Sequence, residues 1–202
     1  MDESALIAEL VERARAAQEK VASYTQEQID DVCRSVAWQV YNDDNIADCA
    51  RVAVEETGMG TVQDKITKHK VKVLGALREV MQAKTVGLIE EDPVLRIRKY
   101  AKPVGVVGAL TPVTNPTATP ASNAVHILKG RNAVIFGPHP RAKKSARVAC
   151  DFMRAGLRTV GAPEDLVQHI EEPTLPLSQE LMRQVDLVLA TGGQGVVKAA
   201  YS

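Results

Sequence analysis

The chain has 202 residues, 45% of them hydrophobic and 25% charged, which are the proportions of a soluble globular protein and not of a disordered one. No apolar run reaches the length of about 18 residues that a membrane span needs, and the start of the chain lacks a secretory signal, so we expect a cytoplasmic protein. Residues 1–100 hold 18 acidic and 14 basic residues, and residues 101–202 hold 7 acidic and 11 basic residues. This mild asymmetry and the aromatic content of only 3% argue against a nucleic-acid binder. The basic second half suits the binding of small phosphorylated ligands.

The first 85 residues are predicted to be helical. Apolar residues recur at helical spacing in residues 6–21, and Thr25 followed by Gln28 is a capping-box pattern that begins a second helix. Residues 42–44 end that helix, a third follows until Gly58, and a fourth is expected at about residues 62–84.

The apolar pattern changes after residue 94. Residues 95–100 alternate, which predicts a half-exposed strand, and residues 104–110 form a nearly continuous apolar run, typical of a strand buried on both faces. Short apolar runs recur at residues 133–136, 166–170 and 185–190, separated by helix-like segments. This alternation predicts an α/β fold with a parallel sheet and crossover helices.

The last element suggests a longer protein. Residues 191–195 turn into a helix that has barely begun at residues 196–202, whereas a doubly wound sheet normally continues beyond this point. We therefore expect the sequence to be the front part of a larger chain.

Polar residues follow the carboxyl end of the buried strand, where open α/β sheets bind ligands. Two prolines, Pro112 and Pro116, stiffen this loop, and Asn115 between them could offer an amide donor to a developing oxyanion. The alternative is a turn in which Asn115 bonds to its own backbone. The residues alone leave both interpretations open.

The segments that follow two further strands contain residue types that occur in ligand-binding loops. Residues 137–141 lead into a helix with basic residues at its start, which permits anion binding, although on charge alone a solvated basic face is favoured. His139 has no carboxylate or cysteine partner in view, so no metal site is predicted. The glycines of residues 191–195 would let a backbone approach a pyrophosphate; the alternative is a tight strand-to-helix turn.

The three cysteines are not expected to act as nucleophiles. Cys33, Cys49 and Cys150 fall singly on helical segments, in neither metal-ligand nor redox spacing. This placement is typical of small buried thiols without a catalytic role.

Taken together, the motifs resemble those of a known family. Pro103, Gly105 and Val106, with the following loop of Pro112 and Asn115, are similar to a segment of the aldehyde dehydrogenase superfamily. The closer similarity is to its coenzyme A-acylating branch, which includes acetaldehyde and sulfoacetaldehyde dehydrogenases and the N-terminal half of aldehyde–alcohol dehydrogenases. The motifs that carry it are E-T-G-M-G at 56–60, T-N-P-T at 114–117, R-N-A-V-I-F at 131–136, P-H-P-R-A-K at 138–143, G-A-P-E-D-L at 161–166, L-A-T-G-G at 189–193 and V-K-A-A-Y-S at 197–202.

The resemblance implies an NAD- or NADP-dependent reaction of a small aldehyde with coenzyme A, catalysed by a cysteine in a domain beyond residue 202. The 202-residue chain alone is therefore expected to be inactive. Asn115 matches the oxyanion-hole asparagine. The positions expected to bind the cofactor are Leu110, Thr111, Pro112, Val113, Thr114, Asn115, His139, Pro140, Arg141, Pro163, Thr191, Gly192 and Gly193.

The resemblance also divides the chain into three parts. Residues 1–85 would be the N-terminal helical part of the cofactor domain, residues 86–103 an oligomerisation hairpin and strand that implies a homo-oligomer, and residues 104–202 a Rossmann-like nucleotide-binding part, with the catalytic domain absent.

The hydrolytic branch and a non-catalytic module are the two alternatives to the acylating branch. Gly137 and Pro140 replace the lysine and glutamate that grip the ribose in the hydrolytic branch, which argues against that branch and leaves NAD versus NADP open. A non-catalytic nucleotide-binding module is the other alternative; the intact segment around Asn115 argues against it.

Overall fold

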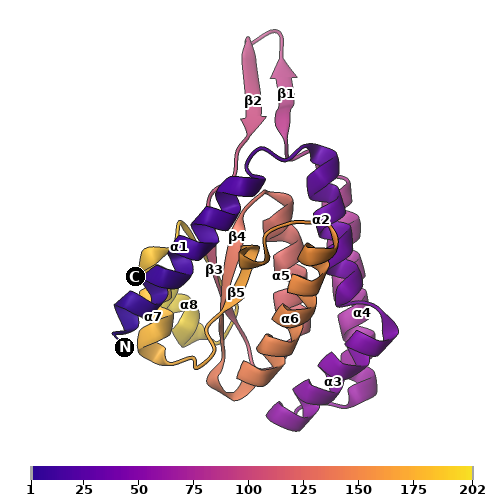
Figure 1. Ribbon diagram of the computed structural model, residues 1–202, viewed down its shortest axis with the longest axis vertical. Helices are drawn as coiled ribbons and strands as arrows, with labels where there is room; N and C mark the ends of the chain where they lie inside the picture. Colours follow the sequence, from indigo (N-terminus) through magenta and orange to yellow (C-terminus); the bar gives the residue numbers. More distant parts are fainter. Residues whose placement is uncertain (1, 202) are drawn as a thin grey trace.

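A four-stranded parallel sheet lies at the centre of the computed structural model, which describes residues 2–201 (Figure 1). Its strands are β3 (Val106–Thr111), β4 (Ala133–Pro138), β5 (Val167–His169) and β6 (Leu187–Ala190), in the spatial order β5-β4-β3-β6. The chain thus moves outward from β3 to β5 and then returns to the other side of β3, so the strand order reverses between β3 and β6. Such a switch point places a ligand crevice at the carboxyl ends of the strands. The predicted α/β fold is confirmed.

The predicted N-terminal helices are present as α1 (Glu3–Val21), α2 (Gln26–Gln39), α3 (Asp43–Thr57) and α4 (Val62–Met81). The capping box of α2 is complete, because the Thr25 hydroxyl accepts a hydrogen bond from the Gln28 backbone N–H and the Gln28 side chain accepts one from the Thr25 N–H. Gly58 ends α3 in the left-handed conformation, with φ of 67°. The fourth helix ends at Met81, three residues before the expected end.

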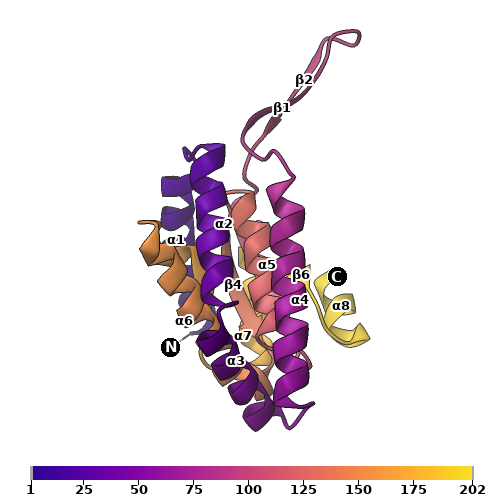
Figure 2. The same cartoon turned by 90° about the vertical axis from the view of Figure 1, so that its right-hand side faces the viewer.

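Helices cover both faces of the sheet. Helices α1 and α7 (Leu175–Gln184) pack on one face, and α5 (Ala118–Lys129) and α6 (Lys143–Thr159) pack on the other. Helices α2, α3 and α4 form an outer layer over α5 and α6; Figure 2 shows α4 running alongside α5. Helix α8 (Gln194–Tyr201) follows the edge strand β6, where Leu187 and Leu189 are exposed. None of the helices within residues 2–201 is long and apolar enough to cross a membrane.

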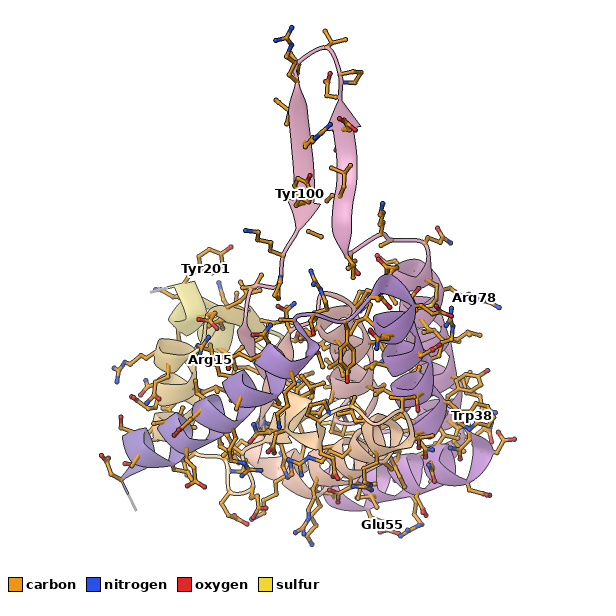
Figure 3. All side chains as sticks on the ribbon, turned by 45° about the horizontal axis from the view of Figure 1, so that its top comes forward. Arg15, Trp38, Glu55, Arg78, Tyr100 and Tyr201 are labelled. Atoms are coloured by element: carbon orange, nitrogen blue, oxygen red, sulfur yellow. The ribbon has the colours of Figure 1, made fainter. Side chains whose placement is uncertain are left out.

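A two-stranded hairpin projects from one end of the molecule (Figure 1). It consists of β1 (Gly87–Asp92) and β2 (Ile97–Ala101), which pair with each other in an antiparallel ladder and with no other strand of the described residues. The strand predicted near residue 97 is present, but the expectation that one of its faces is buried is wrong, because Ile97 and Tyr100 are 46% and 57% exposed. The reason is that the hairpin leaves the body of the molecule, so neither face packs on a core. Figure 3 shows Tyr100 on the projecting hairpin.

The base of the hairpin lies near a buried ion pair. Lys129, the last residue of α5, places its ammonium 2.5 Å from the Asp30 carboxylate of α2, and the two side chains are 3% and 16% exposed. Gln26 donates a second hydrogen bond to the same carboxylate oxygen at 2.9 Å. Because Gln26 also accepts hydrogen bonds from the N–H groups of Thr85 and Val86, this cluster ties α2, α5 and the entry to the hairpin together.

Helices α2 and α6 approach so closely at Gly156 that only glycine fits there. A Cβ on Gly156 would lie 2.8 Å from the backbone oxygen of Ser35 and from the Cα of Val36, and the Ser35 hydroxyl donates to the Gly156 carbonyl at 2.8 Å. Because backbone atoms cannot move aside as a flexible side chain can, an added methyl group would force the helices apart.

We expect Gly156→Ala to lower the free energy of unfolding by about 1–3 kcal/mol, because overpacking outweighs the better helix propensity of alanine. The matched control is Gly75→Ala in α4, where a Cβ would meet no atom within 4 Å. There, alanine should raise the free energy of unfolding by about 0.5–1 kcal/mol. Urea unfolding of both variants gives the comparison, and a stabilised Gly156→Ala variant would contradict the close approach.

Candidate functional site

A cavity of about 750 Å³ opens at the carboxyl edge of the sheet, next to the switch point between β3 and β6. Residues that follow β3, β4 and β6 contribute to its lining, and α4, α7 and α8 close its sides. The lining residues are Lys72, Leu110, Thr111, Pro112, Val113, Thr114, Asn115, Thr119, Gly137, Pro138, His139, Pro140, Thr174, Leu175, Ser178, Met182, Thr191, Gly192, Gly193, Gly195, Val196 and Ala199. The lining is largely apolar, and among the described residues that form it Lys72 is the one lysine, arginine or carboxylate.

The cavity brings together eleven of the residues that the sequence singled out. These are residues 110–115, His139, Pro140 and residues 191–193, which come from three strand ends; the first and last of these residues are 83 positions apart in the chain. They meet because parallel strands present their carboxyl ends at a single edge.

Two residues of the predicted set do not line the cavity. Arg141 turns away, and its guanidinium donates to the Thr57 carbonyl at 3.5 Å. Pro163 precedes β5, where the chain enters the sheet, so it lies at the opposite, amino edge. Pro163 lies away from this cavity because the motif that contains it comes before a strand instead of after one, and its part in cofactor binding stays a prediction.

Asn115 is half-buried in the loop between β3 and α5, and its carbonyl accepts a hydrogen bond from the Thr119 N–H at 3.2 Å. Within residues 2–201 its side-chain amide makes no hydrogen bond, so the alternative of a turn asparagine that bonds to its own backbone is wrong. The amide is free to act as a donor in the cavity.

The basic start of α6 is not an open anion site. The Glu56 carboxylate at the end of α3 accepts hydrogen bonds from the backbone N–H groups of Lys144 and Ser145, both at 2.8 Å, and from the Ser145 hydroxyl at 2.6 Å. An internal carboxylate therefore already occupies the positive end of this helix. Lys143 is paired with Glu172. These contacts favour the alternative of a basic face over an anion site at the start of this helix.

Burial makes the three thiols unreactive. Cys33, Cys49 and Cys150 are buried, and desolvation raises the pKa of each to about 12. Among the described residues there is no group of three or more histidine, cysteine or acidic side chains that could hold a metal ion.

His69 of α4 lies beneath the Asn115 loop. It is 1% exposed, and its Nδ1 is 3.3 Å from the Thr117 hydroxyl. Desolvation lowers the pKa of His69 to about 4, so the imidazole is neutral at pH 7.

This burial predicts a loss of stability in acid. Between about pH 6.5 and pH 4 the unfolded chain protonates His69 and the folded chain does not, so the free energy of unfolding should fall as the pH falls, by up to about 3 kcal/mol from this group. His169, whose pKa burial also lowers, acts in the same direction. Urea unfolding from pH 7 to pH 4.5 measures the slope. His69→Gln should flatten it; an identical slope in the variant would refute the assignment.

The signals for several lining residues were absent from the sequence. Leu175, Ser178 and Met182 belong to α7, which crosses from β5 to β6 beside the cavity, and Thr174 caps the start of that helix. Lys72 reaches the cavity from α4. None follows a strand directly, and only the packing of these helices brings them to the site.

An open parallel sheet with a cavity at its switch point is the layout in which α/β proteins bind small ligands. The chain belongs to the aldehyde dehydrogenase family, whose model matches residues 2–202. The resemblance inferred from the motifs is thereby confirmed.

The chain is also similar to individual proteins of this family. The chain is 65% identical over 197 residues to the sulfoacetaldehyde dehydrogenase of an Acholeplasma species, covering 98% of this chain and 41% of that protein. Its structure is similar to that of an acetylating aldehyde dehydrogenase from Geobacillus thermoglucosidasius, with a TM-score of 0.94, 37% identity, and coverage of 98% of this chain and 44% of the other. An engineered glycolyl-CoA reductase with bound NADP+ matches with a TM-score of 0.82, 28% identity, and coverage of 97% and 44%. The chain thus spans less than half the length of these relatives.

Proposed function

We propose that the chain is the cofactor-binding part of an acylating aldehyde dehydrogenase, which uses NAD or NADP to convert an aldehyde and coenzyme A to an acyl-CoA, or runs in reverse. The observation that carries this proposal is the cavity, which joins the free amide of Asn115 to the glycine turn at residues 191–193. The acetylating aldehyde dehydrogenase and the engineered glycolyl-CoA reductase among the similar structures support the acylating chemistry. The nucleophilic cysteine is proposed to lie outside the described residues, because the three thiols here are buried.

The lining fits a dinucleotide. A bound nicotinamide would supply the hydride acceptor. Leu110, Val113 and Met182 offer apolar surface to a flat ring. A Cβ on Gly193 would meet no atom within 4 Å, so the backbone at the start of α8 is open to a pyrophosphate. In this arrangement Asn115 donates a hydrogen bond to the oxygen of the reacting aldehyde as negative charge develops on it.

Packing around Gly137 favours the acylating alternative over the hydrolytic one. A Cβ on Gly137 would lie 2.7 Å from Cδ2 of Leu110 and 3.3 Å from Cδ2 of Leu181. A lysine at this position, which is the ribose-gripping residue of the hydrolytic branch, would need both leucines to move.

The test is the requirement for coenzyme A. We expect the intact enzyme to form NADH or NADPH from an aldehyde only when coenzyme A is present, with an acyl-CoA as the product. Equal rates without coenzyme A, with the free acid as product, would overturn the acylating assignment. Calorimetric titration of the 202-residue chain with NAD, NADP and coenzyme A should show weak nucleotide binding, and this chain should show no turnover.

We also propose that the hairpin joins copies of the protein into a homo-oligomer. Its exposed apolar side chains, including Val94, Ile97 and Tyr100, support an interface there. Light scattering after size exclusion should show a smaller particle for Ile97→Glu than for the unmodified enzyme.

A further inference from the structure

Helix α4 holds the loop that contains Asn115 at two points. The Lys65 ammonium donates a hydrogen bond to the Thr114 carbonyl at 2.7 Å, and His69 contacts the Thr117 hydroxyl at 3.3 Å. Lys65 and His69 are four residues apart, so they lie on the same face of α4, one turn from each other. Asn115 lies between the two attachment points.

The contact at Lys65 is well suited to fixing the peptide that precedes Asn115. The Thr114 carbonyl and the Asn115 N–H belong to one planar peptide group, so holding the carbonyl orients the backbone that enters Asn115. Hydrogen bonds from a charged donor are stronger than neutral ones. Lys65 is half-buried, and desolvation together with the nearby Lys68 lowers the pKa of its ammonium. Within residues 2–201 no carboxylate pairs with Lys65, so its ammonium is committed to the loop.

The other side of Asn115 is fixed as well. Its own carbonyl accepts from Thr119, and the Thr117 carbonyl accepts from Ala121 at 3.1 Å in the first turn of α5. The backbone on both sides of Asn115 is therefore hydrogen-bonded, while the side-chain amide, which lines the cavity, has no partner among the described residues. A donor held in this way needs no reorganisation when charge develops beside it.

We propose that Lys65 is a positioning residue, which orients the Asn115 amide for the reaction through the Thr114 carbonyl. The effect of Lys65 on the reaction rests on the proposed function. The effect of Lys65 on the loop does not, since it can be measured in the 202-residue chain by itself. The simpler explanation, a surface tie that only adds stability, predicts a different set of results.

The first measurement is amide hydrogen exchange by NMR on the 202-residue chain. Lys65→Met should raise exchange about tenfold or more at Thr119 and Ala121, whose N–H groups bond to the loop, with little change in the melting temperature. Lys65→Arg should restore protection, because it also donates to a carbonyl. Lys68→Met is the matched control, being the same residue type one turn further along α4 without a hydrogen bond to the loop, and should leave exchange unchanged. Unchanged exchange in Lys65→Met would overturn the proposal.

The second measurement is the steady-state kinetics of the intact enzyme with aldehyde, coenzyme A and NAD. Lys65→Met should lower kcat about tenfold with the KM for NAD nearly unchanged, and Lys65→Arg should recover most of kcat. A raised exchange rate with normal kcat would make Lys65 a structural tie and refute positioning. If the unmodified enzyme itself does not form acyl-CoA, the proposed function fails; the exchange result would then separately show whether Lys65 holds the loop.

Discussion

Asn115→Ala is expected to lower the turnover of the intact enzyme by about 100-fold or more. Removing one oxyanion donor typically costs about 2.7–4 kcal/mol in the transition state. The effect should be confined to the chemical step, because the amide makes no hydrogen bond within the described residues and its loss leaves no buried partner unpaired. Steady-state kinetics should therefore show a reduced kcat with nearly unchanged affinity for the nicotinamide cofactor.

A second substitution separates charge from shape at the same position. Asn115→Asp keeps the size of the side chain but places a carboxylate against the developing negative charge, so its turnover should be lower still. Both variants should melt within a few degrees of the unmodified protein. Normal turnover in Asn115→Ala would show that the free amide has no role in the reaction.

Asp30→Ala is expected to lower the free energy of unfolding by about 3–5 kcal/mol. The substitution leaves the Lys129 ammonium, whose side chain is 3% exposed, without its carboxylate, and an unpaired buried charge is strongly destabilising. Urea unfolding at neutral pH measures the loss directly.

The neighbouring residue supplies the control. Asp31 pairs with Arg34 at 2.7 Å, but both side chains are more than half exposed. Asp31→Ala should therefore change the free energy of unfolding by no more than about 1 kcal/mol. The double variant Asp30→Leu with Lys129→Met, which removes both charges, should recover most of the stability lost in Asp30→Ala. Equal losses for Asp30→Ala and Asp31→Ala would show that burial of the pair is unimportant.

The parts of the fold that follow local rules could be predicted from the sequence. The hydrogen bonds between Thr25 and Gln28 span three residues, and Gly58 ends its helix through its own backbone conformation. The apolar run before Thr111 identified a buried strand, because a strand covered on both faces has no polar side to display. The strand-end loops of the site followed from the same logic, since parallel strands end at one edge.

Features that depend on distant contacts could not be predicted. Glu56 and the N–H of Lys144 are 88 residues apart, and nothing near either residue marks the other as its partner. The same is true of Lys65, which reaches Thr114 across 49 residues. The alternation of apolar and polar residues in β2 predicted a strand but not its exposure. A hairpin that projects from the core has side chains alternating between its two faces, as does one that packs against the core.

Because the three cysteines are buried, thiol reagents should distinguish them from any exposed cysteine of the intact enzyme. Raising a thiol pKa from about 9 to about 12 lowers the thiolate fraction at neutral pH about a thousandfold, and the thiolate is the form that an alkylating reagent attacks. Iodoacetamide or a maleimide should therefore modify Cys33, Cys49 and Cys150 only when the fold opens. Rapid alkylation of the native intact enzyme would label a cysteine elsewhere in the protein, and slow alkylation of these 202 residues would time their unfolding.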